Sequence, residues 1–327
     1  MTAPAHEQGA ALLTVLIIVG IIAALAVASF ERLRLATLLG GNAGGQEQAR
    51  SFAGVAEALV AVRIDDLLAA SPARTTLAGG WQGREQVLPL PGGLARATVR
   101  DGGNCFNLNS LVTGTPPDGL VTRPLAVEQF QRLMAALAVP AGDARRIAAA
   151  AADWIDSDST PNPDGAEDSV YARAATPYRT ANTLMAEASE LRAVAGVTPA
   201  LYARLRPWLC ALPETELSPI NVNTLVPAQA PLLEMLFPAT LGAPAARAVI
   251  GERPQAGWTQ VEAFWNTPTL RDYEPPGDVL RQPRVKTGWF ALDLGLVVGD
   301  SELRESALVD ARVPPARIAS RRWTRDE

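Results

Sequence analysis

The stretch AALLTVLIIVGIIAALAVASF, from Ala10 to Phe30, decides the fold of this chain because it contains 21 consecutive residues without a charge. At about 1.5 Å of rise per helical residue it spans about 30 Å, the hydrocarbon core of one bilayer. A cleavable signal peptide would have an apolar stretch of roughly 7–15 residues behind a positive n-region. Here the leader MTAPAHEQG contains no Lys or Arg, and the apolar run continues into ERLRLATLL without a turn signal. The segment predicts a retained membrane helix rather than an ordinary signal peptide.

The composition of the 327 residues is that of a globular chain and excludes several classes of function. Hydrophobic residues make up 48% and charged residues 19%, which is enough for two or three domains with cores of their own. The net charge is -5 and Lys286 is the only lysine, so no basic tail or stripe marks a nucleic-acid partner. The single histidine, His6, leaves the body of the chain without imidazole for a Ser-His triad, a Cys-His pair or a His-ligated zinc. Most hydrolase chemistry is excluded with it.

The two cysteines, Cys105 and Cys210, are too few for a structural zinc site and lack the Cys-x-x-Cys spacing of a redox motif. The residues alone therefore leave two alternatives, one disulfide or two inert thiols.

Residues 31–104 predict a helix and two strands. The string GGNAGG at Gly40–Gly45 should interrupt the helix with a hinge or a melted turn, because each interior Gly costs about 1 kcal/mol relative to Ala. From Gln46 the helical period returns, and Ser71-Pro72 ends it. The apolar stripe expected to face a sheet consists of Phe52, Val55, Leu59, Val62 and Leu67. The strings REQVLPL and GLARATVR, separated by Pro91-Gly92-Gly93, predict a hairpin that packs on this helix.

Residues 105–283 predict a separate helical domain, with strong helices at VEQFQRLMAALAV and ARRIAAAAADWI. Two lobes within it, at about residues 111–213 and 218–280, each resemble a helix-hairpin-helix unit. Residues 284–327 alternate apolar and polar side chains and predict three antiparallel strands. The expected fold class is α+β: a long N-terminal helix on an antiparallel sheet, with a large all-α domain inserted between the strands.

An acidic loop in the helical domain is the strongest candidate for a binding site. Six carboxylates lie in the 16 residues from Asp153 to Asp168, and no basic residue follows before Arg173. Carboxylates this close repel unless a cation lies among them, and Ca²⁺ takes about six to eight oxygens in irregular geometry. Asp156 as the first position of an EF-hand would put Pro161, not Gly, at the sixth, so that geometry is not expected. A solvated acidic loop and a glycosidase carboxylate pair are the alternatives.

The N-terminus resembles the type IV prepilin class, in which a dedicated peptidase cuts after a glycine that precedes the apolar helix. The resemblance implies cleavage between Gly9 and Ala10, followed by methylation of the Ala10 amine. The fifth residue after the cut is Thr14, where nearly all members carry a glutamate that pairs with the N-terminal ammonium of a neighbouring subunit. Ala10 in place of Phe and a leader without basic residues also depart from the pattern. Because the positive-inside rule would place Arg32 and Arg34 in the cytoplasm, the orientation rests on the resemblance.

Several motifs together are similar to the minor pseudopilin K family of type II secretion systems, over almost the whole chain. They are FNLNSLV at residues 106–112, GAED at 165–168, YRTAN ending in Asn182, INVNT at 220–224, and the missing glutamate at Thr14. The resemblance implies a pilin-like fold with an inserted helical domain, anchored in the inner membrane by residues 10–30 after removal of leader 1–9, with the bulk of the chain periplasmic. It implies a non-enzymatic subunit at the tip of a pseudopilus. The implied partners are the I- and J-type minor pseudopilins, the major pseudopilin and the prepilin peptidase.

The same resemblance implies that the acidic loop binds Ca²⁺. The ligands carried over are Asp156, Asp158, Glu167 and Asp168, and then Asp164 and Asn182. In the periplasm thiols oxidise, so Cys105 and Cys210 are expected to be paired.

Two other functions remain open from the sequence. The helix-hairpin-helix lobes raise the alternative of a membrane-anchored, competence-type DNA-binding protein. DNA-binding hairpins have Gly-rich turns flanked by Lys or Arg, whereas here the turn at Gly196 continues as VTPA and the turn around Gly242 has Arg247 as its nearest cation. The other is a tethered periplasmic calcium module without a role in assembly, and the missing glutamate at Thr14 argues against it.

Overall fold

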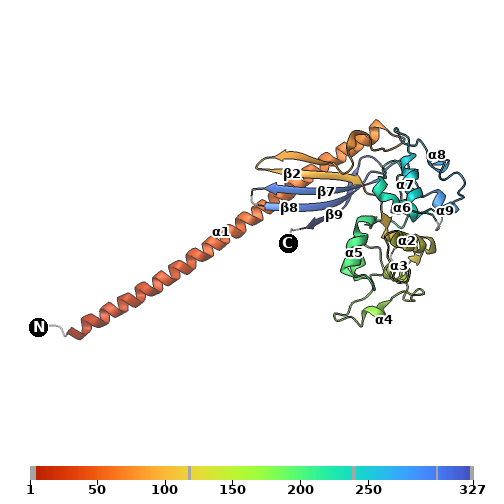
Figure 1. Cartoon of the computed structure of the whole chain (residues 1–327). Coiled ribbons are helices and arrows are strands. Elements are labelled where there is room, and N and C mark those ends of the chain that lie inside the picture. Colours follow the sequence, from red (N-terminus) through yellow and green to blue (C-terminus); the bar gives the residue numbers. More distant parts are fainter. Residues whose placement is uncertain (1–4, 117–118, 238–240, 300, 325–327) are drawn as a thin grey trace.

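The computed structural model describes residues 5–116, 119–237, 241–299 and 301–324. One helix, α1 (Ala5–Ala70), runs from the N-terminal end into the globular part of the molecule (Figure 1). Its N-terminal half stands alone and carries apolar side chains that are about half exposed or more from Leu12 to Leu39. It is long and apolar enough to cross a membrane, and none of its most apolar window is buried. An N-terminal apolar helix fits a membrane anchor.

The predicted break at Gly40–Gly45 is wrong, because α1 is continuous through this segment. A cost of about 1 kcal/mol for each Gly lowers helix stability but does not forbid the helix. Gly45 has a packing reason: a Cβ atom there would lie 2.4 Å from the Ser301 Oγ. This glycine lets α1 approach the start of a strand closely.

Five strands form an antiparallel sheet in the order β1-β2-β7-β8-β9. Their bounds are β1 (Glu85–Leu90), β2 (Gly93–Asp101), β7 (Trp289–Val298), β8 (Ser301–Asp310) and β9 (Arg317–Thr324). The hairpin and the three C-terminal strands thus lie where the alternation predicted them. Helix α1 covers one face of this sheet and the α+β fold class is confirmed (Figure 1).

The face of α1 that packs on the sheet matches the predicted stripe only in part, because Phe52 and Leu67 pack against this core and the other three members do not. The buried positions follow the helical period and are Ala49, Ala53, Ala56, Val60, Ile64 and Leu68. Val55, Leu59 and Val62 are instead 61%, 41% and 56% exposed. The alanines on the buried face let the helix axis approach the Leu-rich sheet closely. Val55, Leu59 and Val62 lie on the opposite, outer side of α1.

The chain leaves the sheet after β2 and returns at β7, and the residues between them form the insert at the end of the sheet farthest from the N-terminus (Figure 1). Its α-helices are α2 (Pro124–Ala136), α3 (Ala141–Ile155), α4 (Asp168–Tyr171), α5 (Pro199–Leu205), α6 (Ala230–Glu234), α7 (Ala243–Gly251), α8 (Val261–Trp265) and α9 (Gly277–Leu280). The insert has a hydrophobic core of its own, separate from the core between α1 and the sheet.

Short elements complete the chain. The 3-10 helices are η1 (Ala78–Gly80), η2 (Leu108–Leu111), η3 (Ala188–Ala193), η4 (Arg206–Trp208) and η5 (Pro227–Gln229). Two-residue strands pair as β3 (Phe106–Asn107) with β6 (Leu209–Cys210) and β4 (Val112–Thr113) with β5 (Val121–Thr122). The first predicted hairpin lobe therefore joins a 3-10 helix, η3, to α5 through a turn at Gly196, whose φ is +84°.

Candidate functional site

Two similar strings, FNLNSL at residues 106–111 and INVNTL at 220–225, begin the two lobes of the insert. Each places two asparagines in the buried interior, Asn107 and Asn109 in the first, Asn221 and Asn223 in the second. In each pair the first side chain accepts a bond from the backbone N–H of the second, at 3.2 Å and 3.0 Å. We call residues 106–212 the first lobe and residues 220–285 the second lobe.

The second asparagine of each pair holds the middle of its lobe. Asn109 accepts from the Met185 N–H at 2.7 Å and donates to the Met185 carbonyl at 2.9 Å. Asn223 makes the same two bonds with Trp258, at 2.7 Å and 2.9 Å. Each also donates to a carbonyl at the end of its lobe, Leu212 for Asn109 and Val285 for Asn223. A buried amide with all these bonds satisfied fixes three distant segments of chain relative to one another.

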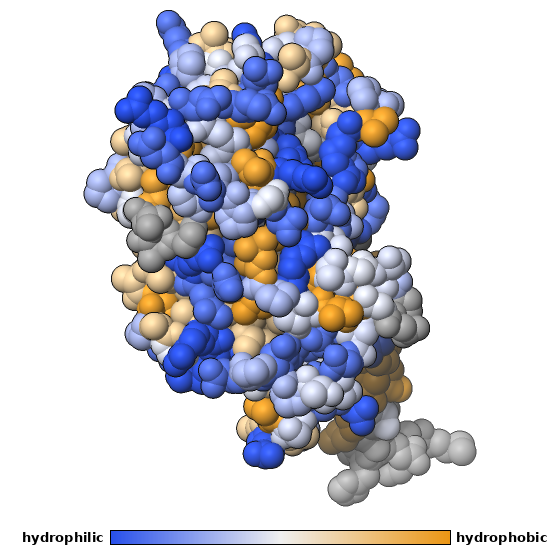
Figure 2. Space-filling model, turned by 90° about the vertical axis from the view of Figure 1, so that its right-hand side faces the viewer, coloured by the Kyte–Doolittle hydropathy of each residue, from blue (hydrophilic) through white to orange (hydrophobic). Residues whose placement is uncertain are grey.

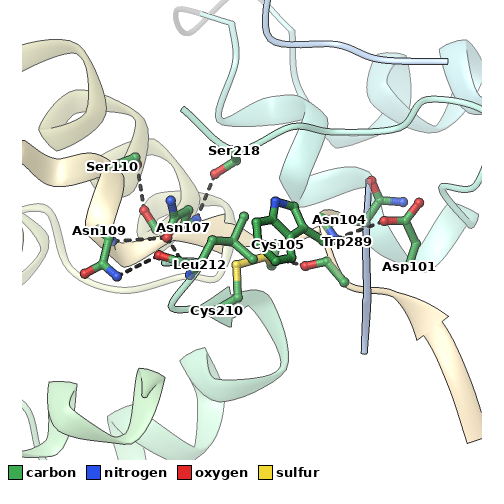
Figure 3. Close-up of a disulfide and its surroundings, with 12 residues drawn as sticks. Asp101, Asn104, Cys105, Asn107, Asn109, Ser110, Cys210, Leu212, Ser218 and Trp289 are labelled. Atoms are coloured by element: carbon green, nitrogen blue, oxygen red, sulfur yellow. Dashed lines mark hydrogen bonds between the residues drawn. A yellow bond between two sulfur atoms is a disulfide. The ribbon is translucent and has the colours of Figure 1, made fainter. Parts of the chain in front are cut away.

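A buried polar junction ties both lobes to the sheet, and Figure 3 shows Asp101 and Asn104 of this junction near the Cys105–Cys210 disulfide. Asp101, at the end of β2, accepts bonds from the Thr224 and Thr287 hydroxyls, and burial raises its pKa. Asn104 accepts from the Asn221 N–H at 2.8 Å. Cys105 and Cys210 are joined in a disulfide, the first of the two alternatives that the residues left open. This disulfide connects the junction to the end of the first lobe.

The acidic loop follows α3, which carries Asp153 in its last turn and ends with Asp156 as its C-cap residue. Ligand oxygens of Asp156, Asp158 and Glu167 all lie within 4.8 Å of one another. Asp156 and Glu167 are only 2% and 4% exposed, whereas Asp158 is exposed. We call these three residues the acidic cluster.

Several buried oxygens of this loop have no hydrogen-bond donor among the described residues. They are one oxygen of Asp156, both oxygens of Glu167, and the amide oxygen of Asn182. Asn182 joins the loop from a left-handed backbone conformation, φ +48°, and its amide nitrogen donates to the Asp158 carbonyl at 3.5 Å. A buried oxygen without a donor costs about 1–3 kcal/mol, so four of them together are suited to a positively charged ligand.

The electrostatics agree with that reading. Burial, and then repulsion from Asp153, Asp156 and other neighbouring carboxylates, raises the pKa of Glu167 to about 7. Burial also raises the pKa of Asp156 to about 6, against the bond that it accepts from the Thr122 hydroxyl. Both groups resist ionisation in the protein alone. A hard divalent cation with oxygen ligands, of which Ca²⁺ best tolerates an irregular site, fits this donor set.

Not all predicted ligands lie in the cluster. Asp164 is exposed on a turn with φ +66°. Asp168 accepts bonds from the Thr180 N–H and hydroxyl, at 2.9 Å and 3.0 Å, at the start of α4. These two carboxylates lie outside the group of oxygens that the acidic cluster brings together.

Asp153 shapes the loop although the sequence did not single it out as a ligand. It is fully buried and accepts bonds from the Asn162 and Ala166 N–H groups, at 3.1 Å and 2.6 Å. Gly165 must be glycine here, because a Cβ atom would lie 2.0 Å from an Asp153 oxygen. The GAED motif therefore combines a glycine that makes room for Asp153 with the buried carboxylate Glu167.

The processing and assembly residues lie in the free half of α1. Gly9 and Ala10 are in its first turns, and Thr14 is exposed. Residues 1–4 of the expected leader lie outside the described residues.

Comparisons with known proteins agree on one family. Two family models, each described as type II secretion system (T2SS), protein K, match residues 104–214 and 220–282. The type II secretion system protein K of Pectobacterium carotovorum subsp. carotovorum is 35% identical, over 97% of both chains, and that of Aeromonas hydrophila is 36% identical, over 93% of both. A solved structure of the GspK-GspI-GspJ complex from enterotoxigenic Escherichia coli contains a chain with a TM-score of 0.74 and 33% identity. That match covers 86% of this chain and 97% of the solved one.

Proposed function

The chain belongs to the type II secretion system protein K family and is a minor pseudopilin of that system, and from this premise we propose that it forms the tip of the periplasmic pseudopilus. It would assemble there with the I- and J-type minor pseudopilins and promote fibre assembly for protein export across the outer membrane. The solved relative is a chain of a GspK-GspI-GspJ complex, which supports the I- and J-type proteins as partners. The relatives do not support the DNA-binding alternative.

The observation that carries the tip position is where the insert lies. It extends beyond the end of the sheet that is farthest from the apolar part of α1 (Figure 1). A fibre grows by stacking pilin-like cores along their first helices, and the insert occupies the space where a further core would stack. The outward face of the insert is mostly hydrophilic, with small scattered hydrophobic patches, as expected of a surface that ends an assembly (Figure 2).

Thr14 supports the same position. A buried carboxylate in hydrocarbon is costly unless it is paired, and pilins pair it with a neighbour's ammonium. A subunit with threonine there offers no such charge to a subunit above it, so it fits at the end of a fibre.

The acidic loop would bind Ca²⁺ in this function. Asp156, Glu167 and Asn182 would supply buried oxygens that lack donors, and Asp158 would supply an exposed carboxylate oxygen close to those of Asp156 and Glu167. The cation would neutralise the loop and fix its shape, and the chain needs no catalytic group for this structural role. Metal analysis of the purified protein tests it: we expect calcium in stoichiometric amount, and a Glu167→Gln variant should lose it.

The N-terminal helix would anchor the chain in the inner membrane, with the bulk of the chain in the periplasm and the major pseudopilin below it. Prepilin peptidase would cut after Gly9 and methylate Ala10. Mass spectrometry of the mature N-terminus tests this, and a mature chain that starts beyond Phe30 would contradict it.

Co-purification tests the tip assignment. The full chain, co-expressed with the I- and J-type minor pseudopilins of the same organism and extracted in detergent, should elute as a complex with both. A chain that elutes alone in the presence of both partners would overturn the proposal.

A further inference from the structure

Two buried carboxylates face each other between α1 and the sheet, far from the acidic loop. Glu57 of α1 is 5% exposed and Glu305 of β8 is 2% exposed. Arg321 of β9 donates to one oxygen of Glu57 at 2.9 Å. Among the described residues, no donor reaches the other oxygen of Glu57 or either oxygen of Glu305.

The surroundings of this pair leave negative charge uncompensated. The neighbours of Glu305 across the sheet are Leu294 on β7 and Trp323 on β9, neither of which carries a charge. On α1, the Asp65 carboxylate accepts from the Ala316 N–H at 3.0 Å. Burial, and then the adjacent Glu57, raises the pKa of Glu305 well above its ordinary value, while Arg321 opposes the shift. The two buried carboxylates therefore have one guanidinium between them, and a proton shared by the pair would balance the remaining negative charge.

Glu57 also lines an open groove of about 480 Å³ between α1 and β9. The α1 side of the groove carries the small residues Gly54, Ala58 and Ala61, and the other side is formed by Pro315–Ile318 and Arg321. A Cβ atom at Gly54 would meet nothing within 4 Å. We call this feature the α1–β9 groove.

The shape of the groove fits an α-helix. Positions 54, 58 and 61 follow the helical spacing of four and three, so their small side chains form a continuous track along α1. Such a track lets a second helix approach closely, as small residues do where helices pack. Val55, Leu59 and Val62 are exposed beside the track and would gain burial in the contact.

We propose that the α1–β9 groove receives a helix of a neighbouring pseudopilin, and that an Arg or Lys side chain of that helix pairs with Glu57 and replaces the proton shared with Glu305. This inference rests on the proposed function. The partner helix carries its cation among small or apolar side chains where it faces Gly54, Ala58 and Ala61. The other charged residues that line the groove are Asp65, Arg317 and Arg321. On binding, the proton leaves to solvent and the cation takes its place beside the carboxylates.

The exchange of a proton for a cation predicts how binding depends on pH. Binding releases a proton, so affinity rises with pH until the pair is ionised in the free protein. Glu305→Gln removes the residue that shares the proton and should leave a binding affinity that is nearly independent of pH. Glu57→Gln removes the carboxylate that lines the groove and should weaken binding at least tenfold.

The test uses the full chain in detergent, titrated separately with the I-type and the J-type minor pseudopilin at pH 6, 7 and 8. One of the two should bind more tightly at pH 8 than at pH 6. Ala58→Leu fills the track at an exposed position without touching the core and should weaken that binding at least tenfold. The matched controls are Ala69→Leu, exposed near the end of α1, and Glu85→Gln, on the opposite edge strand β1.

The outcomes separate this inference from the proposed function. If the wild-type chain binds neither partner, both fall. If it binds while Ala58→Leu and Glu57→Gln bind as well as wild type, the groove is not the seat of a partner helix, although the tip assignment stands. If these variants weaken binding but the affinity does not change with pH, a helix occupies the groove and the proton exchange is wrong.

Discussion

The two lobes of the insert share one frame and differ in what that frame holds. In both, an Asn-x-Asn string fixes a mid-lobe residue, Met185 or Trp258, and a residue at the end of the lobe. Between the second main helix and that mid-lobe residue, the second lobe has only residues 252–257. The first lobe has residues 156–184, which include the acidic loop.

The short connection of the second lobe, residues 252–257, packs directly against the asparagine frame. Gly257, with φ +75°, passes so close to Asn223 that a Cβ atom would lie 2.9 Å from its side chain. Among the described residues of the second lobe, the buried oxygens without partners are the hydroxyls of Thr267 and Tyr273, and none is a carboxylate. The long connection instead buries Asp156 and Glu167 without donors. The difference predicts that the frame is stable by itself and that the loop inserted into the first lobe is stabilised by a cation.

Removal of the disulfide is expected to cause the largest loss of stability, and to cause it in the first lobe. The Cys105–Cys210 bond spans 105 residues and encloses almost all of the first lobe, while the second lobe has none. Cys105→Ser with Cys210→Ser should lower the free energy of unfolding by up to about 4–5 kcal/mol on the chain-entropy model. Pulse proteolysis of the first lobe against the second would show it. Equal loss of protection in both lobes would mean that the bond acts through the junction rather than through the first lobe.

Removing an asparagine should damage either lobe by a similar amount. Asn109→Ala leaves the polar groups of Met185 and Leu212 without partners, and Asn223→Ala does the same to Trp258 and Val285. Each substitution should cost about 3 kcal/mol, since a buried unsatisfied group costs about 1–3 kcal/mol. Thermal unfolding measures the loss, with the exposed Asn266→Ala as control. A large loss in one lobe alone would break the proposed equivalence of the frames.

Removing the cation should affect the first lobe only. If Ca²⁺ binds the folded loop, it contributes about 2.7 kcal/mol at a hundredfold excess over its dissociation constant. Chelation should therefore lower the melting temperature and expose Thr160–Gly165 to protease. Mg²⁺ should restore stability poorly, because an irregular site does not meet its octahedral preference. Restoration by Mg²⁺ as complete as that by Ca²⁺ would contradict the assignment of the metal.

The pH dependence of the calcium-free protein is a smaller effect. The pKa of Glu167 is raised to about 7 and that of Asp156 to about 6, so the folded chain holds protons that the unfolded chain releases above about pH 4.5. Stability should thus fall as the pH rises from about 4.5 to about 7. The raised pKa of Glu305 gives a pH dependence in the same direction in both wild type and Glu167→Gln. The difference between their melting temperatures across this range, both measured with chelator, therefore reports the contribution of Glu167. Parallel curves for the two proteins would refute a role of Glu167.

The smallest effect is expected at Asp168. Its carboxylate orders Thr180 through two bonds at a half-exposed site and lies outside the acidic cluster. Asp168→Asn should cost about 1 kcal/mol or less and leave calcium affinity nearly unchanged, whereas Glu167→Gln should abolish it. Calcium titration of the two variants compares them directly. Equal loss of affinity would place Asp168 among the ligands.

Much of this architecture could be predicted from local pattern, and the errors have a common cause. The uncharged run, the alternation in the C-terminal strands and the helices α2 and α3 were readable because their periods lie within one element. The packing reason for a glycine at position 45 is Ser301, which is distant in sequence. Val55, Leu59 and Val62 lie on the outer side of α1 because alanines pack on the sheet instead. The apolar period was assigned to the larger side chains, and the alanines were overlooked.

The same limit applies to the site. Composition found the acidic loop, but it could not distinguish Asp153, which holds the loop backbone, from Asp156 and Glu167, which lack donors. It could not tell that Asp164 is exposed on a turn and that Asp168 accepts two bonds from Thr180. The strings FNLNSL and INVNTL were visible as motifs, and their similarity, with Asn at the second and fourth positions of both, was the available signal of two equivalent frames.

Hydrogen exchange resolved by lobe, with and without a calcium chelator, tests most directly whether the first lobe depends on a cation and the second does not. The full chain in detergent should lose protection over residues 156–184 on chelation and regain it when Ca²⁺ is restored. Residues 252–257 and the sheet should exchange at the same rates in both states. Unchanged exchange over residues 156–184 in metal-stripped protein, or equal loss in both lobes, would contradict the account.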